Sequence, residues 1–281
     1  MTHDKIPLAG VIGAPIAHSK SPHLHQHWLA TLGIAGYYVP LHVEAGDLET
    51  ALRSLPKLGF VGVNVTVPHK ERALEMADQV SEQAERIGAA NTLTFGLDET
   101  IYADNTDAYG FGMNLRQNAP NWQPARGPAI LFGAGGAARA VIVALLDVGA
   151  PEVRVVNRTR SRADALKRQF GDRVTVVDWD RPGHALADAM TVVNTTSLGM
   201  TGQAPWSIPL DTLNPDAVVT DLVYAPLETP LLSTAKAIGC TCVDGLGMLL
   251  HQGARAFEIW TGRKPSVEAM RRALEDAVYG K

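Results

Sequence analysis

The first part of the chain alternates short apolar runs with longer stretches in which apolar residues recur every three or four positions. Residues 8–13, 37–43 and 60–63 have the apolar composition of buried strands, whereas residues 22–33 and 47–56 have the spacing of amphipathic helices. Alternation of strand and helix is typical of parallel βαβ units. We therefore predict an α/β domain at the start of the chain.

The pattern after residue 63 predicts the end of this domain. Residues 71–88 have helical spacing and are expected to form one helix. Residues 91–107 contain two strand-like runs separated by Gly96, Leu97 and Asp98, which predicts a hairpin. The first domain is therefore expected to end near Asp107.

A second series of strands and helices follows a polar stretch that contains Pro120, Pro124 and Pro128. Its predicted elements are strands at 129–133, 153–157, 174–177, 190–196 and 217–224 and helices at 136–149 and 161–170. This series predicts a second, doubly wound sheet. Residues 247–262 and 266–279 have the pattern of two amphipathic helices that pack back across the domain junction.

The fold class is therefore α/β with two domains. We expect a first domain of residues 1–107, completed by the helices of residues 248–281, and a second domain of residues 108–247. A length of 281 residues suits two modest domains.

Composition narrows the class of protein further. The chain is 46% hydrophobic and 19% charged, as expected of a globular protein, and its net charge of −4 gives no basic field for nucleic acid. No apolar stretch approaches the length of a membrane span, and the first residues have no apolar signal region, so we expect a cytoplasmic enzyme. Cys240 and Cys242 are too few for a structural zinc site and are expected to be core thiols.

The stretch "GAGGAARA", residues 133–140, follows a predicted strand and opens a predicted helix, which is the setting of a dinucleotide-binding loop. In the pattern G-x-G-x-x-A, Gly133 permits the tight turn, Gly135 lets backbone amides approach a pyrophosphate, and Ala138 permits close packing of helix on strand. The alternative is a glycine-rich turn that binds no ligand.

Residues 157–162, "NRTRSR", lie at the end of the next predicted strand, where an acidic residue would hold the ribose 2′-hydroxyl of NAD. The stretch has no acid and three arginines. A guanidinium can pair with a 2′-phosphate, so the expected cofactor is NADP. Arg158 and Arg162 are the candidates, and Arg160 is expected to be an ordinary residue of a solvated helix start.

Lys70 follows the apolar run of residues 60–63 and Pro68, which fits the opening of a helix. The carboxyl end of a strand is where open α/β sheets place their ligands, and a cation in the first turn of a helix opposes the helix dipole. The simpler alternative is a solvated lysine at a helix start. Lys70 therefore needs a partner elsewhere in the chain if it has a chemical role.

Seven motifs in a fixed order resemble those of the shikimate dehydrogenase family. They are "HSKSPHLH" (18–25), "NVTVPHK" (64–70), "GAANTL" (88–93), "NTD" (105–107), "GAGGAARA" (133–140), "NRT" (157–159) and "DGLGMLLHQ" (244–252). The resemblance implies NADPH-dependent, reversible reduction of 3-dehydroshikimate to shikimate, a step of the shikimate pathway of aromatic amino acid biosynthesis.

The resemblance also implies roles for particular residues. Lys70 and Asp107 would form the catalytic pair, in which either Lys70 alone or both residues carry the proton. Ser19 and Ser21 would hold the substrate carboxylate, with helix capping as the alternative. The other implied substrate contacts are Thr66, Asn91, Tyr224 and Gln252. The implied cofactor contacts are Gly133, Ala134, Gly135, Gly136, Ala137, Ala138, Asn157, Arg158, Thr159, Arg162, Leu222 and Gly245.

Other functions stay open on the sequence alone. A quinate or dual quinate/shikimate dehydrogenase is the nearest, and a non-catalytic NADP-sensing module would need neither Lys70 nor Asp107. His23, His25 and His27 could suggest a metal site, but three alternate positions do not share a helix face and no H-E-x-x-H carboxylate is present, so we expect no metal. We expect the protein to bind a small-molecule substrate, shikimate or 3-dehydroshikimate. We expect its oligomeric state to be a monomer or a homodimer.

Overall fold

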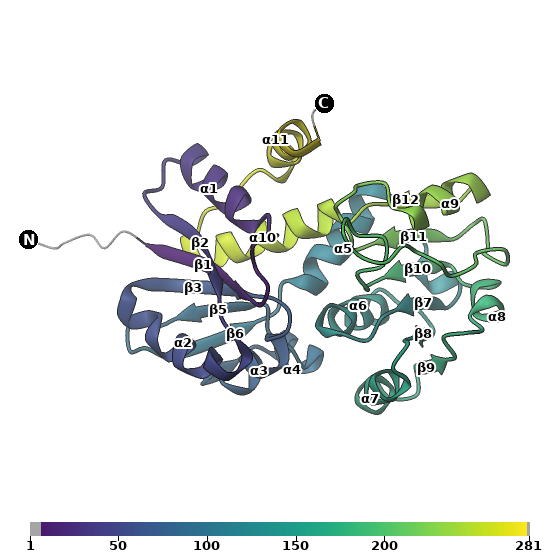
Figure 1. Ribbon diagram of the computed structural model, residues 1–281, viewed down its shortest axis with the longest axis horizontal. Coiled ribbons are helices and arrows are strands. Elements are labelled where there is room, and N and C mark those ends of the chain that lie inside the picture. Colours follow the sequence, from purple (N-terminus) through teal and green to yellow (C-terminus); the bar gives the residue numbers. More distant parts are fainter. Residues whose placement is uncertain (1–6, 280–281) are drawn as a thin grey trace, which may run out of the picture. The chain divides into compact units, whose positions relative to one another are not determined.

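The structure is a computed structural model, and it describes residues 7–279. The chain divides into two compact units, each with its own sheet (Figure 1). Unit 1 extends to Gly110 and resumes at Leu249, and unit 2 comprises Phe111–Met248. Between residues 7 and 279, no helix is both long enough and apolar enough to cross a bilayer.

Unit 1 is built on a mixed six-stranded sheet. In spatial order its strands are β2 (Tyr37–His42), β1 (Leu8–Gly13), β3 (Phe60–Val65), β5 (Thr92–Phe95), β6 (Ile101–Asp104) and β4 (Gln79–Val80). The predicted βαβ units account for the parallel strands β1, β2 and β3. The predicted hairpin forms β5 and β6, and β5 runs antiparallel to β3.

The helices of unit 1 bury the apolar faces that the sequence pattern predicts. They are α1 (Ser21–Thr31), α2 (Leu48–Ser54), α3 (Lys70–Glu75), α4 (Glu82–Ile87), α5 (Asp107–Asn118, shared in sequence with unit 2), α10 (Leu246–Thr261) and α11 (Val267–Tyr279). The tail helices return to the first sheet, as expected, since Trp260 Nε1 on α10 donates to Leu93 O at 3.1 Å. Trp28 Nε1 likewise donates to Ser266 O at 3.4 Å.

The prediction of one helix over residues 71–88 is wrong. The segment forms α3, the short strand β4 and α4. The backbone between the two helices pairs with β6 instead of continuing a helix: Ser81 N donates to Ala103 O at 2.9 Å, and Asp78 N donates to Ile101 O at 3.0 Å. Ser81 Oγ then accepts from Ala84 N at 3.1 Å and starts α4.

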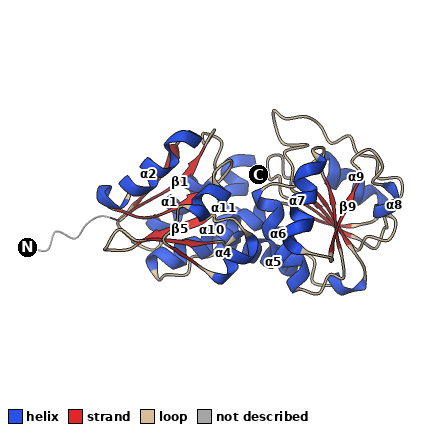
Figure 2. Ribbon diagram, turned by 90° about the horizontal axis from the view of Figure 1, so that it is seen from below, coloured by secondary structure: helices blue, strands red, loops and turns tan. Residues whose placement is uncertain are grey.

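Unit 2 is the predicted doubly wound domain. Its sheet is entirely parallel, in the order β12 (Thr241–Val243), β11 (Val218–Asp221), β10 (Thr191–Asn194), β7 (Ala129–Phe132), β8 (Val153–Val156) and β9 (Val174–Val177). Figure 2 shows α6 (Gly136–Asp147) and α7 (Arg160–Phe170) on one face, with α8 (Gly183–Leu186) and α9 (Pro230–Ile238) on the other. Both faces are covered, which explains the continuous apolar runs of the strands.

The two cysteines lie where the sequence predicts, in the core of unit 2. Cys240 is 7% exposed, and Cys242 is half-buried against the same apolar cluster. Both thiols are free, and burial raises the pKa of Cys240 to about 11. These thiols are therefore packing residues and not reactive nucleophiles.

Candidate active site

One edge of the unit 1 sheet collects polar residues from three neighbouring strands. The register aligns Asn64 at the end of β3 with Thr92 at the start of β5, and Thr92 with Asp104 at the end of β6. Because β5 is antiparallel to its neighbours, the segments that follow β3 and β6 and the segment that precedes β5 meet at this edge. These segments carry Lys70, Asp107 and Asn91.

Lys70 and Asp107 form an ion pair at this edge. Lys70 is the first residue of α3, and its side chain is 12% exposed, whereas the side chain of Asp107, the first residue of α5, is 7% exposed. A solvated lysine at a helix start would be exposed and need no partner. The structure therefore places the ammonium in a largely buried pair, where proton transfer is possible.

Asn91 connects this pair to the rest of the site. Its Nδ2 donates to Asp107 Oδ1 at 2.8 Å, and its Oδ1 accepts from Thr106 N at 2.8 Å. Asn91 is 2% exposed, so its amide is held by hydrogen bonds on both sides, unlike a surface turn residue. The orientation of the Asp107 carboxylate is therefore set by a buried amide as well as by Lys70.

Gln252, on α10, also lies in this cluster. Its Oε1 accepts from Asn91 Nδ2 at 3.3 Å, and its Nε2 donates to Leu249 O at 2.9 Å. The tail helix thus brings a side chain 161 positions further along the sequence to Asn91.

Ser19, Ser21 and Thr66 lie at the carboxyl ends of β1 and β3. The N-cap residue of helix α1, Lys20, supplies no side-chain cap, and Ser19 Oγ accepts from the first amide of the helix, Ser21 N, at 3.3 Å. Thr66 N donates to Ile12 O at 2.9 Å. A Cβ on Gly13 would lie 2.6 Å from Thr66 Cγ2, so the glycine permits this close approach.

The sequence motifs also contain positioning residues that were not predicted. Asn105 Oδ1 accepts from Asp107 N at 2.9 Å, and its Nδ2 donates to Ala89 O at 2.8 Å. Asn64 Oδ1 accepts from Tyr38 Oη at 2.8 Å, and its Nδ2 donates to Asn91 O at 3.1 Å. Polar residues inside otherwise apolar strand ends were the signal that could have identified them.

His25, one of the three histidines of α1, lies in an aromatic cluster. His25 is 1% exposed and stacks on Tyr38, with ring centroids 4.0 Å apart. Within the described residues, no group of three or more histidine, cysteine, aspartate or glutamate side chains could hold a metal ion.

In unit 2 the glycine-rich loop joins β7 to α6 at the carboxyl edge of the sheet. Gly133 has φ +113°, and a Cβ there would lie 2.4 Å from Thr195 Oγ1, so glycine is required. Gly135, the N-cap of α6, supplies no side-chain oxygen to the first helical amides, and a Cβ on it would have no neighbour within 4 Å. A helix amino end with open space above it fits a phosphate group.

The arginines after β8 differ in their surroundings. Arg160 is ion-paired with Asp178, in keeping with the structural role expected of it. Among the described residues, no ion pair or side-chain hydrogen bond engages Arg158 or Arg162, and both are exposed. Asn157 Nδ2 donates to Thr159 O at 2.8 Å and shapes the turn between them.

Leu222, Tyr224 and Gly245 also belong to the carboxyl edge of the second sheet. Leu222 and Tyr224 follow β11, and Gly245 follows β12. A Cβ on Gly245 would lie 2.5 Å from Leu222 O, so the two segments touch through their backbones. The sequence-predicted contacts therefore fall into two groups, with Tyr224 and the cofactor candidates in unit 2 and the remaining candidates in unit 1.

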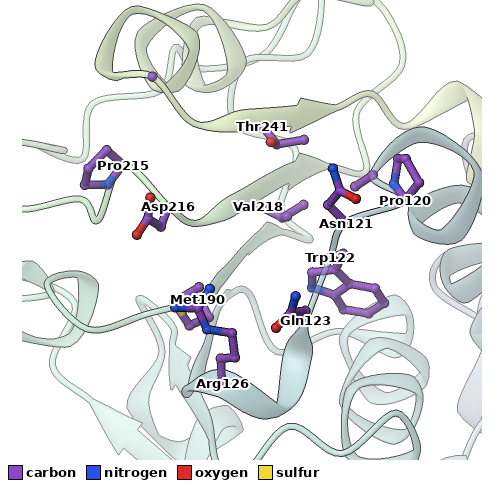
Figure 3. A pocket seen from close by; sticks show the side chains of 12 residues that line it. Pro120, Asn121, Trp122, Gln123, Arg126, Met190, Pro215, Asp216, Val218 and Thr241 are labelled. Atoms are coloured by element: carbon purple, nitrogen blue, oxygen red, sulfur yellow. The ribbon is translucent and has the colours of Figure 1, made fainter.

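A cavity of about 280 Å³ lies at the opposite edge of the second sheet, near the amino ends of its strands (Figure 3). Its lining includes Met190 before β10, Val218 at the start of β11 and Thr241 at the start of β12. None of the predicted cofactor residues lines it. The glycine-rich loop and this cavity therefore belong to different ends of the strands.

A doubly wound domain with a glycine-rich loop, joined to an α/β unit with a buried lysine–aspartate pair, defines a pyridine-nucleotide-dependent oxidoreductase. Three family models match: the shikimate dehydrogenase substrate binding domain at residues 11–93, shikimate / quinate 5-dehydrogenase at 117–200, and the shikimate 5'-dehydrogenase C-terminal domain at 245–275. The chain belongs to the shikimate dehydrogenase family.

Curated relatives support this family assignment. The chain is 61% identical over 269 residues to a shikimate dehydrogenase (NADP(+)) of Cereibacter sphaeroides, which covers 96% of both chains. It is 60% identical over 273 residues to that of Roseobacter denitrificans, which covers 97% of this chain and 99% of the relative.

Two solved structures cover nearly all of the chain. One is shikimate 5-dehydrogenase from Thermus thermophilus in complex with NADP(H) and shikimate, with 39% identity, a TM-score of 0.86 and coverage of 96% of this chain and 99% of that chain. The other is quinate dehydrogenase from Corynebacterium glutamicum in complex with NAD, with 35% identity, a TM-score of 0.87 and coverage of 95% and 98%.

Proposed function

We propose that this chain catalyses the reversible, NADPH-dependent reduction of 3-dehydroshikimate to shikimate, a step in aromatic amino acid biosynthesis. The buried Lys70–Asp107 pair carries this proposal, because a binding module has no need of a desolvated acid–base pair. Relatives that are about 60% identical over almost the whole chain are named for this activity. The proposed compartment is the cytoplasm, and the proposed oligomeric state is a monomer or a homodimer.

The residues of unit 1 bind and orient the substrate and move its proton. The reduced nicotinamide, when bound, supplies a hydride to the carbonyl carbon. The Lys70 ammonium then donates a proton to the carbonyl oxygen, and Asp107 holds Lys70 in place and shares the proton. The Asn91 amide fixes the Asp107 carboxylate from the other side.

The remaining candidates of unit 1 bind the ring and its carboxylate. The hydroxyls of Ser19 and Ser21 donate to the carboxylate, and Thr66, Asn91 and Gln252 contact the ring hydroxyls. A set of donors and acceptors suits a polyhydroxylated ring better than a single fixed cation does. Residues 1–107 with 248–281 are the proposed substrate domain, and Tyr224 is the substrate contact supplied by residues 108–247.

The NADP site occupies the carboxyl edge of the second sheet. The pyrophosphate binds the amides of the loop from Gly133 to Ala138, and Arg158 and Arg162 pair with the 2′-phosphate. Asn157 and Thr159 shape the part of the site that binds the adenosine of NADP. Leu222 and Gly245 contact the nicotinamide end of the cofactor. The guanidinium groups of Arg158 and Arg162 support this assignment, because within residues 7–279 both are exposed and form no ion pair that would compete with an anion.

Four initial-rate measurements test the function: shikimate or quinate, each with NADP or NAD. We expect the shikimate–NADP pair to give the highest kcat/KM. A higher value for quinate with NAD would favour the second candidate, which the similarity to the Corynebacterium glutamicum enzyme supports. Binding of NADP without turnover of either acid would indicate a sensing module.

A further inference from the structure

Asp221, the last residue of β11, is a buried carboxylate that the proposed mechanism does not use. It is 0% exposed, and among the described residues it forms no ion pair with a lysine, arginine or histidine. Burial of an uncompensated charge costs free energy. A carboxylate in this position therefore requires an explanation.

Three neutral donors hold the carboxylate. Asn194 Nδ2 donates to Oδ1 at 2.8 Å, Val223 N donates to Oδ1 at 3.0 Å, and Thr229 Oγ1 donates to Oδ2 at 2.7 Å. Thr229 is also the N-cap of α9, so the carboxylate lies near the positive end of a helix dipole. These donors stabilise the ionised form, although burial raises the pKa of Asp221 to about 6, which leaves it mostly ionised above pH 7.

Asp221 lies beside the residues proposed to contact the nicotinamide. Its carboxylate Oδ1 accepts from Val223 N and so brackets Leu222, and its main-chain oxygen would lie 2.7 Å from a Cβ on Gly245. The oxidised nicotinamide ring carries a positive charge, whereas the reduced ring is neutral. A fixed negative charge in a poorly solvated sheet edge therefore interacts differently with the two forms of the cofactor.

We propose that the Asp221 carboxylate is an electrostatic element of the cofactor site that selectively strengthens the binding of NADP⁺ relative to NADPH. The inference rests on the proposed function, because it needs the nicotinamide to bind beside Leu222 and Gly245. Asp221 touches no substrate and transfers no proton. It sets the balance between the two redox states of the bound cofactor through its charge.

The test is the dissociation constants of NADP⁺, NADPH and 2′,5′-ADP, measured by calorimetry at pH 8 for wild type and Asp221→Asn. Asparagine keeps the shape, and Thr229 Oγ1 can accept from the new amide. We expect NADP⁺ to bind about tenfold more weakly to the variant, the equivalent of about 1.4 kcal/mol. NADPH should change by less than twofold, and 2′,5′-ADP, which lacks the nicotinamide, should not change.

Asp216→Asn is the matched control, because it removes the same charge from an exposed position before the amino end of β11. Its three constants should equal those of wild type. Equal weakening of NADP⁺ and NADPH in Asp221→Asn would overturn the proposal, since it would indicate loss of loop geometry, and so would three unchanged constants. If Asp221→Asn does not fold, Asp221→Ser replaces it. Wild type that binds none of the three ligands would refute the proposed function itself.

Discussion

Acid should destabilise the first unit through His25, a buried histidine of α1. Its ring stacks on Tyr38 at 4.0 Å and meets Trp28 edge-on at 5.3 Å, and Phe257 and Trp260 of α10 lie within 6 Å. Its Nε2 is buried and finds no hydrogen-bond partner among the described residues. Burial in this aromatic cluster lowers the pKa of His25 from 6.5 to about 3.

The sign of the effect follows from the two pKa values. The folded protein keeps His25 neutral down to about pH 3, whereas the unfolded chain takes up the proton near pH 6.5. The unfolded state therefore binds more protons between these pH values. The contribution of His25 to the free energy of unfolding is complete above pH 6.5 and decreases as the pH drops below 6.5. At about 1.4 kcal/mol per pH unit, the loss from pH 7.5 to pH 5.0 is about 2 kcal/mol.

His25→Phe isolates this contribution, because phenylalanine keeps the stacking and cannot be protonated. The assay is urea unfolding of wild type and variant at pH 7.5 and 5.0, with the free energy of unfolding extrapolated to water. When the pH is lowered from 7.5 to 5.0, we expect the free energy of unfolding of the variant to rise by about 2 kcal/mol relative to that of wild type. His23→Phe, at an exposed position of the same helix, is the matched control for the introduction of a phenylalanine. Parallel pH dependence of wild type and His25→Phe would refute the reasoning.

Three further substitutions test the proposed sites and the packing. Lys70→Met should lower the turnover number about a hundredfold at saturating substrates with a smaller change in the KM for shikimate, and turnover near the wild-type rate would exclude an acid–base role. Arg158→Ala should raise the KM for NADP and leave that for NAD nearly unchanged, whereas Arg160→Ala, which removes an arginine paired with an aspartate, should affect neither. Gly62→Ala should lower the free energy of unfolding by about 3 kcal/mol, because its Cβ would lie 2.2 Å from an indole nitrogen of α10. Gly46→Ala, with no neighbour within 4 Å, should be close to neutral in the same denaturation assay.

The sequence by itself determined the features that depend on neighbouring residues. Apolar periodicity predicted most strands and helices, because one buried face imposes a period of two or of 3.6 on local positions. The loop at Gly133 was also predictable, since its backbone conformation and the start of α6 depend on residues within one turn of each other. The resemblance of ordered motifs then gave the family.

Only the tertiary structure decided which distant residues meet. Residues 71–88 have helical spacing throughout, but pairing with β6 offered the backbone around Ser81 better partners than a continuous helix did. Asn91 reaches Gln252 only because α10 returns to the first sheet. His25 packs against aromatic residues more than 200 positions away on α10, so its burial depends on the tertiary structure. Local pattern carries no information about such long-range pairs, because their free energy is gained only when the whole fold brings them together.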